Sequence, residues 1–306
     1  MRINKYLAEC GVCSRRKADE LILEGRVSVN KKVVKELGVD VNVDKDVVFV
    51  DGKKVVKITH YDYLLFYKPK GCVTTMSEEK DNKSGRKRSD EELEYLQKRA
   101  DKAGKSVDEF LADMQKTPRK IVQDFLGDEY KNKRVYPVGR LDYDSEGLLL
   151  LTNDGNVTYK LTHPSSEIPK TYIVKIEGTI DESDLAILRK GVTVDGVKYG
   201  RCKVKVLGIE KVKGNNKKAM VDPKDPTVAD GSFFENESGV FTRLEVIIFE
   251  GKNREIRRMF ASVEKNVVFL KRIAIGELRL GGLARGTYRP LNDGEVAYLL
   301  DLCSKI

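Results

Sequence analysis

The first 60 residues show two kinds of apolar spacing in succession. Apolar residues between Ile3 and Cys10 recur at helical intervals, and Ser14 stands where its side chain would cap a second helix that Gly25 ends. Short valine-rich runs follow and predict small strands: Val27 with Val29, Val33 with Val34, and 47–50. The pattern predicts a compact α+β module over residues 1–60.

From residue 61 onward, short apolar runs alternate with turn residues. The runs predict strands at 64–67, 148–151, 170–174, 243–249 and 278–280. Helical spacing predicts helices at 121–126, 254–261 and 295–302. Short strands therefore dominate residues 61–306, with helices laid against them, which is typical of an α+β domain.

Two polar segments interrupt this second domain. Residues 77–116 hold ten basic and eleven acidic residues with few aromatics, and we expect them to be partly helical around 90–115. Residues 211–239 hold five basic and five acidic residues and two prolines, which favours a long surface loop. Both segments are predicted to be insertions, and we assign no catalytic role to 77–116.

Positive charge is concentrated at two places in the chain. Residues 1–35 contain nine Lys or Arg against four Asp or Glu, and residues 250–290 contain ten against four. These segments carry +5 and +6 of a net charge of +9, so the remainder is slightly acidic. Such concentration suits a polyanion-binding surface. Nucleic acid is the leading candidate partner.

Several classes of protein are disfavoured by the sequence. The apolar stretches are too short to span a bilayer, and the first residues lack the apolar core of a secretory signal, so we expect a cytoplasmic protein without a membrane partner. Five cysteines do not make a disulfide framework. Cys10 and Cys13 form one C-x-x-C pair without a second pair, and His60 and His163 are the only histidines. We therefore expect buried thiols rather than a metal or redox site.

An acidic loop between Gly139 and Gly147 runs directly into the apolar run 148–151, which an Asp154-Gly155 turn is expected to end. Within it, Asp142 follows a leucine at the edge of the core and is a candidate nucleophile or base. Most acidic residues in such loops only solvate a turn, and that interpretation stays open on spacing alone.

The first module resembles the S4 RNA-binding domain. The motifs are Ser14-Arg15-Arg16-Lys17-Ala18 and Gly25-Arg26-Val27-Ser28-Val29-Asn30. Cations in the first turn of a helix oppose its dipole, which indicates a bound anion such as phosphate. We expect RNA contacts from the following residues: Arg2, Lys5, Arg15, Arg16, Lys17, Arg26, Asn30 and Lys31.

The rest of the chain resembles the RNA pseudouridine synthases of the branch that modifies ribosomal RNA and carries an N-terminal S4 domain. The motifs occur in the family's order: Lys68-Pro69-Lys70-Gly71 with Val73-Thr74-Thr75, Tyr136 to Asp142, Gly147 to Gly155, Lys170-Thr171-Tyr172, and Gly251 to Met259. The resemblance implies an S4-like domain at 1–60 and a catalytic domain at 61–306 built on a mixed, mainly antiparallel sheet with flanking helices.

The resemblance also implies roles for individual residues. Asp142 would be the catalytic aspartate, Tyr172 the tyrosine that stacks on the target base, and Arg257 the cation that pairs with the aspartate and keeps it ionised. Further phosphate contacts would come from Arg140, Lys252, Arg254 and Arg258. Converting uridine to its C5-glycoside involves no redox change or phosphate transfer, so a carboxylate suffices and no cofactor, metal or small-molecule substrate is expected.

Two residues depart from the family pattern: Ser145 replaces a common Thr, and Glu255 replaces a usual Gln and brings negative charge to the basic segment. Within the branch the chain looks most like the B type, which acts on the 23S RNA of the large ribosomal particle, and we expect a monomer. Three alternatives remain: a 16S enzyme, a non-catalytic S4-type ribosome-assembly protein, and a glycosidase with Asp144 or Glu146 as second acid.

Overall fold

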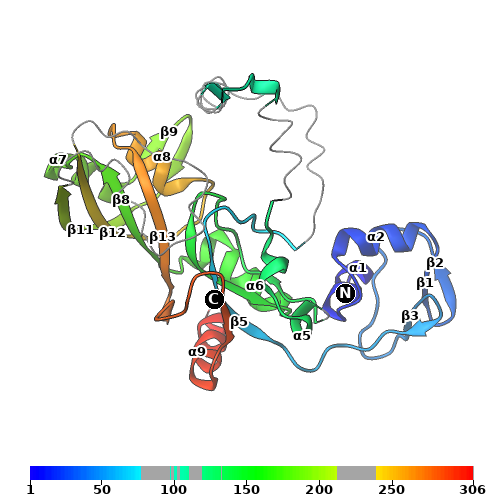
Figure 1. The fold of residues 1–306 in the computed structure, drawn as a ribbon. Coiled ribbons are helices and arrows are strands. Elements are labelled where there is room, and N and C mark those ends of the chain that lie inside the picture. The colour runs from blue at the N-terminus through cyan, green and yellow to red at the C-terminus, as the bar shows by residue number, and fades with distance from the viewer. Residues whose placement is uncertain are drawn as a thin grey trace.

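The computed structural model describes residues 1–76, 119–131, 133–211 and 239–305, together with 97, 100–101 and 104–109. The interpretation of 77–116 as a partly helical insertion therefore falls mostly outside the described residues, and that of 211–239 as a surface loop almost wholly outside them. Figure 1 shows the N-terminal module at one end of the molecule, joined by an extended segment to the strands and helices of the rest.

The N-terminal module has the predicted order of two helices followed by small strands. Helices α1 (Ile3–Glu9) and α2 (Arg15–Leu23) precede β1 (Val27–Val29), β2 (Lys32–Val34), β3 (Val48–Val50) and β4 (Lys53–Lys54), which form a sheet in the order β2-β1-β3-β4. Ser14 Oγ accepts a hydrogen bond from Lys17 N at 3.2 Å, so the predicted cap is confirmed. The N-terminal module has an apolar core of its own, which includes Leu7, Ile22 and Val27.

The second domain is built on one large mixed sheet. Its strands lie in the order β11-β12-β8-β13-β7-β5-β15, with β14 on β13 and β6 on β7. Every pairing along this path is antiparallel except that of β13 with β7. The bounds are β5 (Tyr63–Lys68), β6 (Tyr136–Pro137), β7 (Glu146–Thr152), β8 (Lys170–Glu177), β11 (Cys202–Lys211), β12 (Val240–Ile248), β13 (Val267–Ile275), β14 (Leu278–Arg279) and β15 (Tyr288–Pro290). The mixed, mainly antiparallel sheet is confirmed.

The central strands are covered on both faces. Along β7, Leu149 and Leu151 belong to one apolar cluster, whereas Leu148 and Leu150 belong to another. All four are inaccessible to solvent. Because successive side chains of a strand point to opposite faces, two clusters on alternate residues mean two buried faces. This explains why the sequence shows a continuous apolar run rather than alternation.

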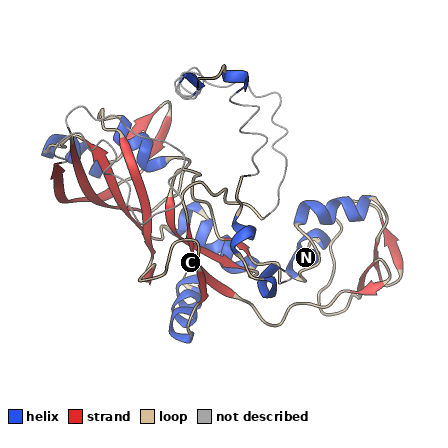
Figure 2. Ribbon diagram, in the orientation of Figure 1, coloured by secondary structure: helices blue, strands red, loops and turns tan. Residues whose placement is uncertain are grey.

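Helices and a small hairpin complete the domain, as Figure 2 shows. The helices are η1 (Val122–Phe125), α5 (Asp128–Lys131), α6 (Gly155–Thr162), η2 (Pro164–Ser166), α7 (Glu182–Lys190), α8 (Glu255–Ala261) and α9 (Asp293–Ser304); β9 (Val192–Val194) pairs with β10 (Val197–Tyr199). The helices predicted near 254–261 and 295–302 are confirmed as α8 and α9. Among the described residues, no helix is long and apolar enough to cross a membrane.

The Asp154-Gly155 turn expected after the apolar run is wrong. Asp154 is instead the N-cap of α6, because its Oδ1 accepts hydrogen bonds from Asn156 N at 2.9 Å and Val157 N at 3.2 Å. An Asp that bonds to backbone N–H groups two and three residues ahead begins a turn and a helix in the same way. Val157 and Leu161 are buried and lie four residues apart, on one face of a helix, so this spacing favours the helix over a turn.

Candidate active site

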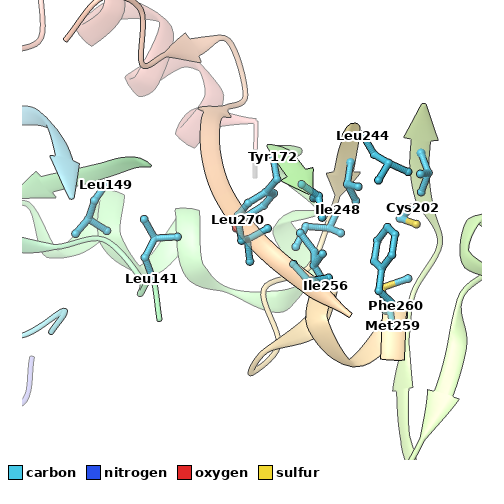
Figure 3. Packing of buried hydrophobic residues seen from close by; sticks show 14 of the residues in the cluster. Leu141, Leu149, Tyr172, Cys202, Leu244, Ile248, Ile256, Met259, Phe260 and Leu270 are labelled. Atoms are coloured by element: carbon cyan, nitrogen blue, oxygen red, sulfur yellow. The ribbon is translucent and has the colours of Figure 1, made fainter. Parts of the chain in front are cut away.

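A pocket of about 340 Å³ lies where the acidic loop before β7 faces β8, β13 and the start of α8. Asp142 from the loop and Tyr172 from β8 both line it. Apolar side chains of Ile248, Ile256 and Leu270 contribute to its wall. Figure 3 shows Leu141, Tyr172, Ile256 and Leu270 among the buried residues of one apolar cluster. The structure thus brings together two of the three residues predicted to be catalytic.

A buried lysine fixes the acidic loop in place. Lys68, at the end of β5, is inaccessible to solvent, and its Nζ donates to the carbonyl oxygens of Asp142 at 3.0 Å, Ser145 at 2.9 Å and Pro69 at 3.1 Å. Burial lowers the pKa of Lys68 to about 8. A single ammonium therefore satisfies the carbonyl groups of Asp142 and Ser145 in the loop and of Pro69 after β5, and holds the loop backbone.

Further hydrogen bonds hold the same loop. Thr74 Oγ1 donates to Leu141 O at 2.6 Å and accepts from Leu141 N at 3.2 Å. Gly71 N donates to Tyr143 O at 2.8 Å. The residues immediately before and after Asp142 are therefore both anchored to the segment that follows β5. That segment contains the Lys68-to-Thr75 motif.

Tyr172 stands on a rigid strand beside a buried arginine. It is 6% exposed and pairs in the sheet with Arg272 of β13. Nη1 of Arg272 lies 3.5 Å from the Tyr172 hydroxyl. The ring is buried and held in the sheet, and Tyr172 lines the pocket. Such a fixed aromatic surface suits stacking against a flat ligand.

Arg257 has an acidic partner two residues beyond the expected one. The predicted partner is Asp142, and the ion pair that is found joins Arg257 Nη2 to Asp144 Oδ2 at 3.2 Å. The same nitrogen donates to the Asp144 carbonyl at 3.2 Å, and Nη1 donates to Val267 O at 2.6 Å. Arg254 also pairs with Asp144, at 3.4 Å. Arg257 therefore links α8, β13 and the acidic loop.

Asp144 and Glu146, the two candidates for a second glycosidase carboxylate, both bind other side chains. Asp144 has the arginine partners described above. Glu146 accepts a hydrogen bond from the Tyr67 hydroxyl at 2.6 Å and pairs with Arg285 at 3.0 Å. Neither lines the described pocket. This arrangement disfavours either residue as the partner of Asp142 in glycoside hydrolysis.

Glu255, which departs from the family pattern, is turned inward. It is 4% exposed, and its Oε2 accepts a hydrogen bond from Lys252 N at 2.8 Å at the start of α8. Burial raises the pKa of its carboxyl group. Its negative charge therefore lies in the pocket wall rather than on the outer surface. The other departure, Ser145, is also buried, and its hydroxyl has no hydrogen-bond partner among the described residues.

The predicted phosphate-binding residues of the second domain gather at the pocket. Arg140, Lys252 and Arg254 line it and have exposed side chains. Lys252 Nζ is tied to Glu250 and to Lys198 O. Arg258 is less exposed, and its Nη1 donates to the Tyr199 hydroxyl at 3.3 Å. Three of the four residues are thus placed at the rim.

The RNA-binding candidates of the N-terminal module divide into two groups. Arg15 and Arg16 are exposed on the first turn of α2. Asn30 is instead used within the module, because its amide donates to Asp46 at 2.9 Å and accepts from Val47 N at 3.0 Å. The basic candidates with acidic or carbonyl partners are Arg2 with Gly38, Lys5 with Glu9, Lys17 with Glu20, and Arg26 with Glu24 and Asp51. Lys31 is exposed in the β1–β2 turn.

Three cations at the site, two buried and one partly buried, were given no role from the sequence. Lys68 and Arg272 are at most 4% exposed, and Lys170 lines the pocket two residues before Tyr172. Burial, with the nearby charge of Arg272, lowers the pKa of Lys170 to about 8. One signal was present: each is a charged residue in or beside a run that otherwise predicts a buried strand. Such a residue requires a buried partner or a ligand.

No group of His, Cys, Asp and Glu side chains suited to a metal ion is found within the described residues. All five cysteines are free thiols, and Cys13, Cys72, Cys202 and Cys303 are buried. Burial raises the pKa of Cys72 to about 11. The predicted buried thiols are thus found at four positions, while Cys10 is partly exposed.

Comparisons with known proteins place the chain among named relatives. A family model described as RNA pseudouridylate synthase matches residues 62–262, and the S4 domain model matches residues 1–48. The chain is 35% identical over 300 residues to ribosomal large subunit pseudouridine synthase B of Bacillus subtilis, covering 97% of this chain and 95% of that protein. It is 34% identical over 299 residues to an uncharacterized RNA pseudouridine synthase of Aquifex aeolicus, covering 98% and 93%.

The fold also matches a solved structure. The crystal structure of a pseudouridylate synthase superimposes with a TM-score of 0.56 at 22% sequence identity, covering 98% of this chain and 99% of the other. At this identity the likeness concerns the fold.

Proposed function

The chain belongs to the RNA pseudouridylate synthase family and carries an S4 domain at its start, and on that basis we propose that it converts a uridine of ribosomal RNA to pseudouridine with Asp142 as the catalytic group. The pocket residues have the right chemical types for this reaction. A carboxylate, an aromatic surface and an apolar wall suffice, because the reaction exchanges one glycosidic bond for another without a net change in atoms.

In the proposed reaction the target nucleotide leaves the RNA stack and its base enters the pocket. The Asp142 carboxylate forms a bond to C1′ while the N1–C1′ bond breaks, and the bonding electron pair remains on the uracil ring. The ring turns, C5 bonds to C1′, and Asp142 leaves. Loss of the proton at C5 and gain of a proton at N1 complete the isomerisation. Tyr172 stacks on the ring throughout, and its hydroxyl is the candidate acceptor of the C5 proton, releasing its own proton to solvent in the same step.

The observation that carries the proposal is the meeting of Asp142 and Tyr172 in one pocket. The two residues come from different elements, the loop before β7 and the middle of β8, and both line the same 340 Å³ space. The loop backbone at Asp142 is held by Lys68 at 3.0 Å. A carboxylate on an anchored loop beside a fixed ring supports nucleophilic catalysis on a stacked base better than it supports a solvated turn.

Arg257 has a positioning role in this proposal. Through its ion pair with Asp144 at 3.2 Å and its bond to the Asp144 carbonyl, it fixes the part of the loop that follows Asp142. Its positive charge near the loop also favours an ionised Asp142. We infer that Arg257 acts on Asp142 through the loop and its charge.

The RNA would reach the pocket across basic surfaces of both domains. Arg140, Lys252 and Arg254 at the rim suit the phosphates beside a flipped nucleotide. Arg15 and Arg16 on α2 suit a more distant part of the same RNA. Two separated basic surfaces would select a folded RNA rather than a free nucleotide.

The large-subunit RNA is the favoured substrate, because the Bacillus subtilis relative with 95% of its length covered is named a large-subunit enzyme. Action on 16S ribosomal RNA is the close alternative. A non-catalytic ribosome-assembly role is the second alternative, and the coupled placement of Asp142 and Tyr172 argues against it. The protein would act in the cytoplasm as a monomer on RNA.

The deciding experiment uses purified protein and unmodified transcripts of both ribosomal RNAs, with pseudouridine mapped by carbodiimide-dependent primer extension. We expect one large-subunit site to appear with the wild-type protein and to be absent with Asp142→Asn, while RNA affinity is retained. Asp195→Asn, an exposed carboxylate in the β9–β10 turn, is the matched control and should be fully active. No pseudouridine in either RNA, or normal activity of Asp142→Asn, would refute the proposal.

A further inference from the structure

Arg272 is a buried cation with unused hydrogen-bonding capacity in the pocket wall. It is 4% exposed, and its Nε donates to Leu148 O at 2.8 Å while Nη1 lies 3.5 Å from the Tyr172 hydroxyl. Its Nη2 is shielded from solvent and has no hydrogen-bond partner among the described residues. A buried donor without a partner is costly, so one that persists at a pocket calls for a ligand.

The backbone around Arg272 fixes where its guanidinium lies. Arg272 pairs with Tyr172 on one side and, in the parallel register, with Gly147 on the other. A side chain at Gly147 would collide with the backbone carbonyl of Arg272, so the strands approach as closely as a glycine permits. Arg272 therefore stands between the strand that carries Tyr172 and the strand that follows the Asp142 loop.

The local charge is not balanced by an acidic partner. Among the described residues, no ion pair joins Arg272 to an Asp or Glu side chain. Lys170 lines the same pocket, and its lowered pKa reflects burial and the charge of Arg272. Glu255 is the buried acid nearby, and its Oε2 is committed to Lys252 N. The buried Arg272 and the partly buried Lys170 against one such acid leave this wall positive, which disfavours a purely structural role.

We propose that Arg272, with Lys170 beside it, binds the uracil ring during the interval in which the ring is detached from the sugar and carries negative charge. This inference rests on the proposed function. When the N1–C1′ bond breaks, its electron pair spreads from N1 to the carbonyl oxygens of the ring. Nη2 of Arg272 donates to one of these oxygens and holds the ring while it turns on Tyr172.

This role differs from that of Asp142. Asp142 acts on the sugar, whereas Arg272 stabilises the leaving group, whose charge is absent from the ground-state base. A donor that is strongest toward the detached ring accelerates the reaction more than it tightens RNA binding. An arginine suits this task because its guanidinium stays charged at all relevant pH values.

The first test measures binding of 5-nitrouracil, an ionised uracil whose absorption band reports its environment. We expect wild-type protein to bind this anion and Arg272→Gln to bind it about 10- to 100-fold more weakly, as for loss of a charged hydrogen bond. Lys271→Gln is the matched control, because it removes a cation from the adjacent β13 position, where Lys271 Nζ lies 4.6 Å from the Tyr67 ring centroid. Equal binding by Arg272→Gln, or no binding by the wild-type protein, would overturn the inference.

The second test measures turnover on the mapped RNA. We expect Arg272→Gln to lower kcat at least 10-fold with little change in KM, Arg272→Lys to lie between it and wild type, and Lys271→Gln to be normal. Thermal melts identify a variant that does not fold, in which case Arg272→Lys carries the comparison. An active wild type with an equally active Arg272→Gln refutes this inference alone. A wild type that binds 5-nitrouracil through Arg272 without making pseudouridine refutes the proposed function and, with it, the role of Arg272 in the reaction, while the anion-binding site itself remains.

Discussion

The Nζ of Lys68 lies 3.0 Å from the carbonyl oxygen of Asp142, so a lysine from β5 holds the backbone of the proposed nucleophile. The lysine and the neighbouring Ser145, whose carbonyl it also bonds, are removed from solvent, and these bonds replace the hydration that they lose. The placement of Asp142 therefore depends on a residue that never reaches the pocket surface. This relationship makes the site sensitive to changes in the β5 strand.

Replacing Lys68 should loosen the loop and destabilise the domain. Lys68→Met keeps much of the side-chain volume but leaves three carbonyl groups without their donor, and we expect unfolding to become easier by about 2–4 kcal/mol. Turnover should fall more than RNA affinity, because Lys252, Arg15 and Arg16, which we propose as phosphate contacts, lie outside the loop that Lys68 holds. Urea denaturation and filter binding test these two expectations. Lys271→Met is the control, since Lys271 makes a cation–π contact with Tyr67 instead; equal stability of Lys68→Met and wild type would contradict the argument.

Lys68 should also give stability a recognisable pH dependence. Its pKa falls from 10.5 in the unfolded chain to about 8 in the fold. Between these values the unfolded chain binds a proton that the folded chain has released, so stability gained from this group rises with pH. The wild-type protein should gain up to about 1.4 kcal/mol per pH unit over Lys68→Met in this window. The measurement is the free energy of unfolding of the wild type minus that of Lys68→Met. If this difference stays constant from about pH 8 to 10, Lys68 does not titrate there.

The Tyr172 hydroxyl should be separable from its ring. Tyr172→Phe keeps the stacking surface and removes the oxygen that lies 3.5 Å from Arg272 Nη1. We expect RNA affinity to be retained and the rate to fall about 10²–10⁴-fold, the usual contribution of a general base. Release of tritium from RNA labelled at C5 of uridine measures the rate. Tyr159→Phe, on an exposed tyrosine of α6, is the control; near-normal turnover of Tyr172→Phe would leave stacking as the role of Tyr172.

The close approach of β7 and β13 predicts a strong effect at Gly147. This glycine has φ +113, and an added Cβ would collide with the Arg272 carbonyl oxygen, a backbone atom that cannot move alone. Gly147→Ala should therefore cost more than about 3 kcal/mol of stability. Gly178→Ala has a positive φ of +71 with no atom within 4 Å of the added carbon, and should cost only about 1–2 kcal/mol. Similar thermal melts for the two variants would show that the contact is not decisive.

The sequence predicts those helix ends that are set by residues close together in the chain. Ser14 and Gly25 delimit α2 as expected, because a cap and a left-handed glycine act within one turn of chain. Asp154 was misassigned because an Asx turn and a helix N-cap begin with the same side-chain bonds. The apolar run 148–151 predicted β7, but only the sheet shows that both of its faces are buried.

The sequence predicts the residues that we propose for catalysis but not the residues that hold them in place. Asp142 and Tyr172 were found through motifs, whereas β13 was not predicted, since Lys271 and Arg272 interrupt its apolar run. Arg272 is buried there because a strand far along the chain supplies Leu148 O as its acceptor. The Asp144 partner of Arg257 likewise depends on how α8 meets the loop. Such pairings between distant segments leave no periodic trace in the sequence.

The parallel pairing of β7 with β13 has a consequence for the order in which the protein becomes competent during synthesis. Lys271 and Arg272 meet Glu146 and Gly147 only after more than a hundred further residues have been made. Contacts of such long sequence separation form late in folding. The S4 domain, complete within the first 55 residues, leaves the ribosome long before the pocket can close. We therefore expect a nascent chain that can hold RNA before it can modify it.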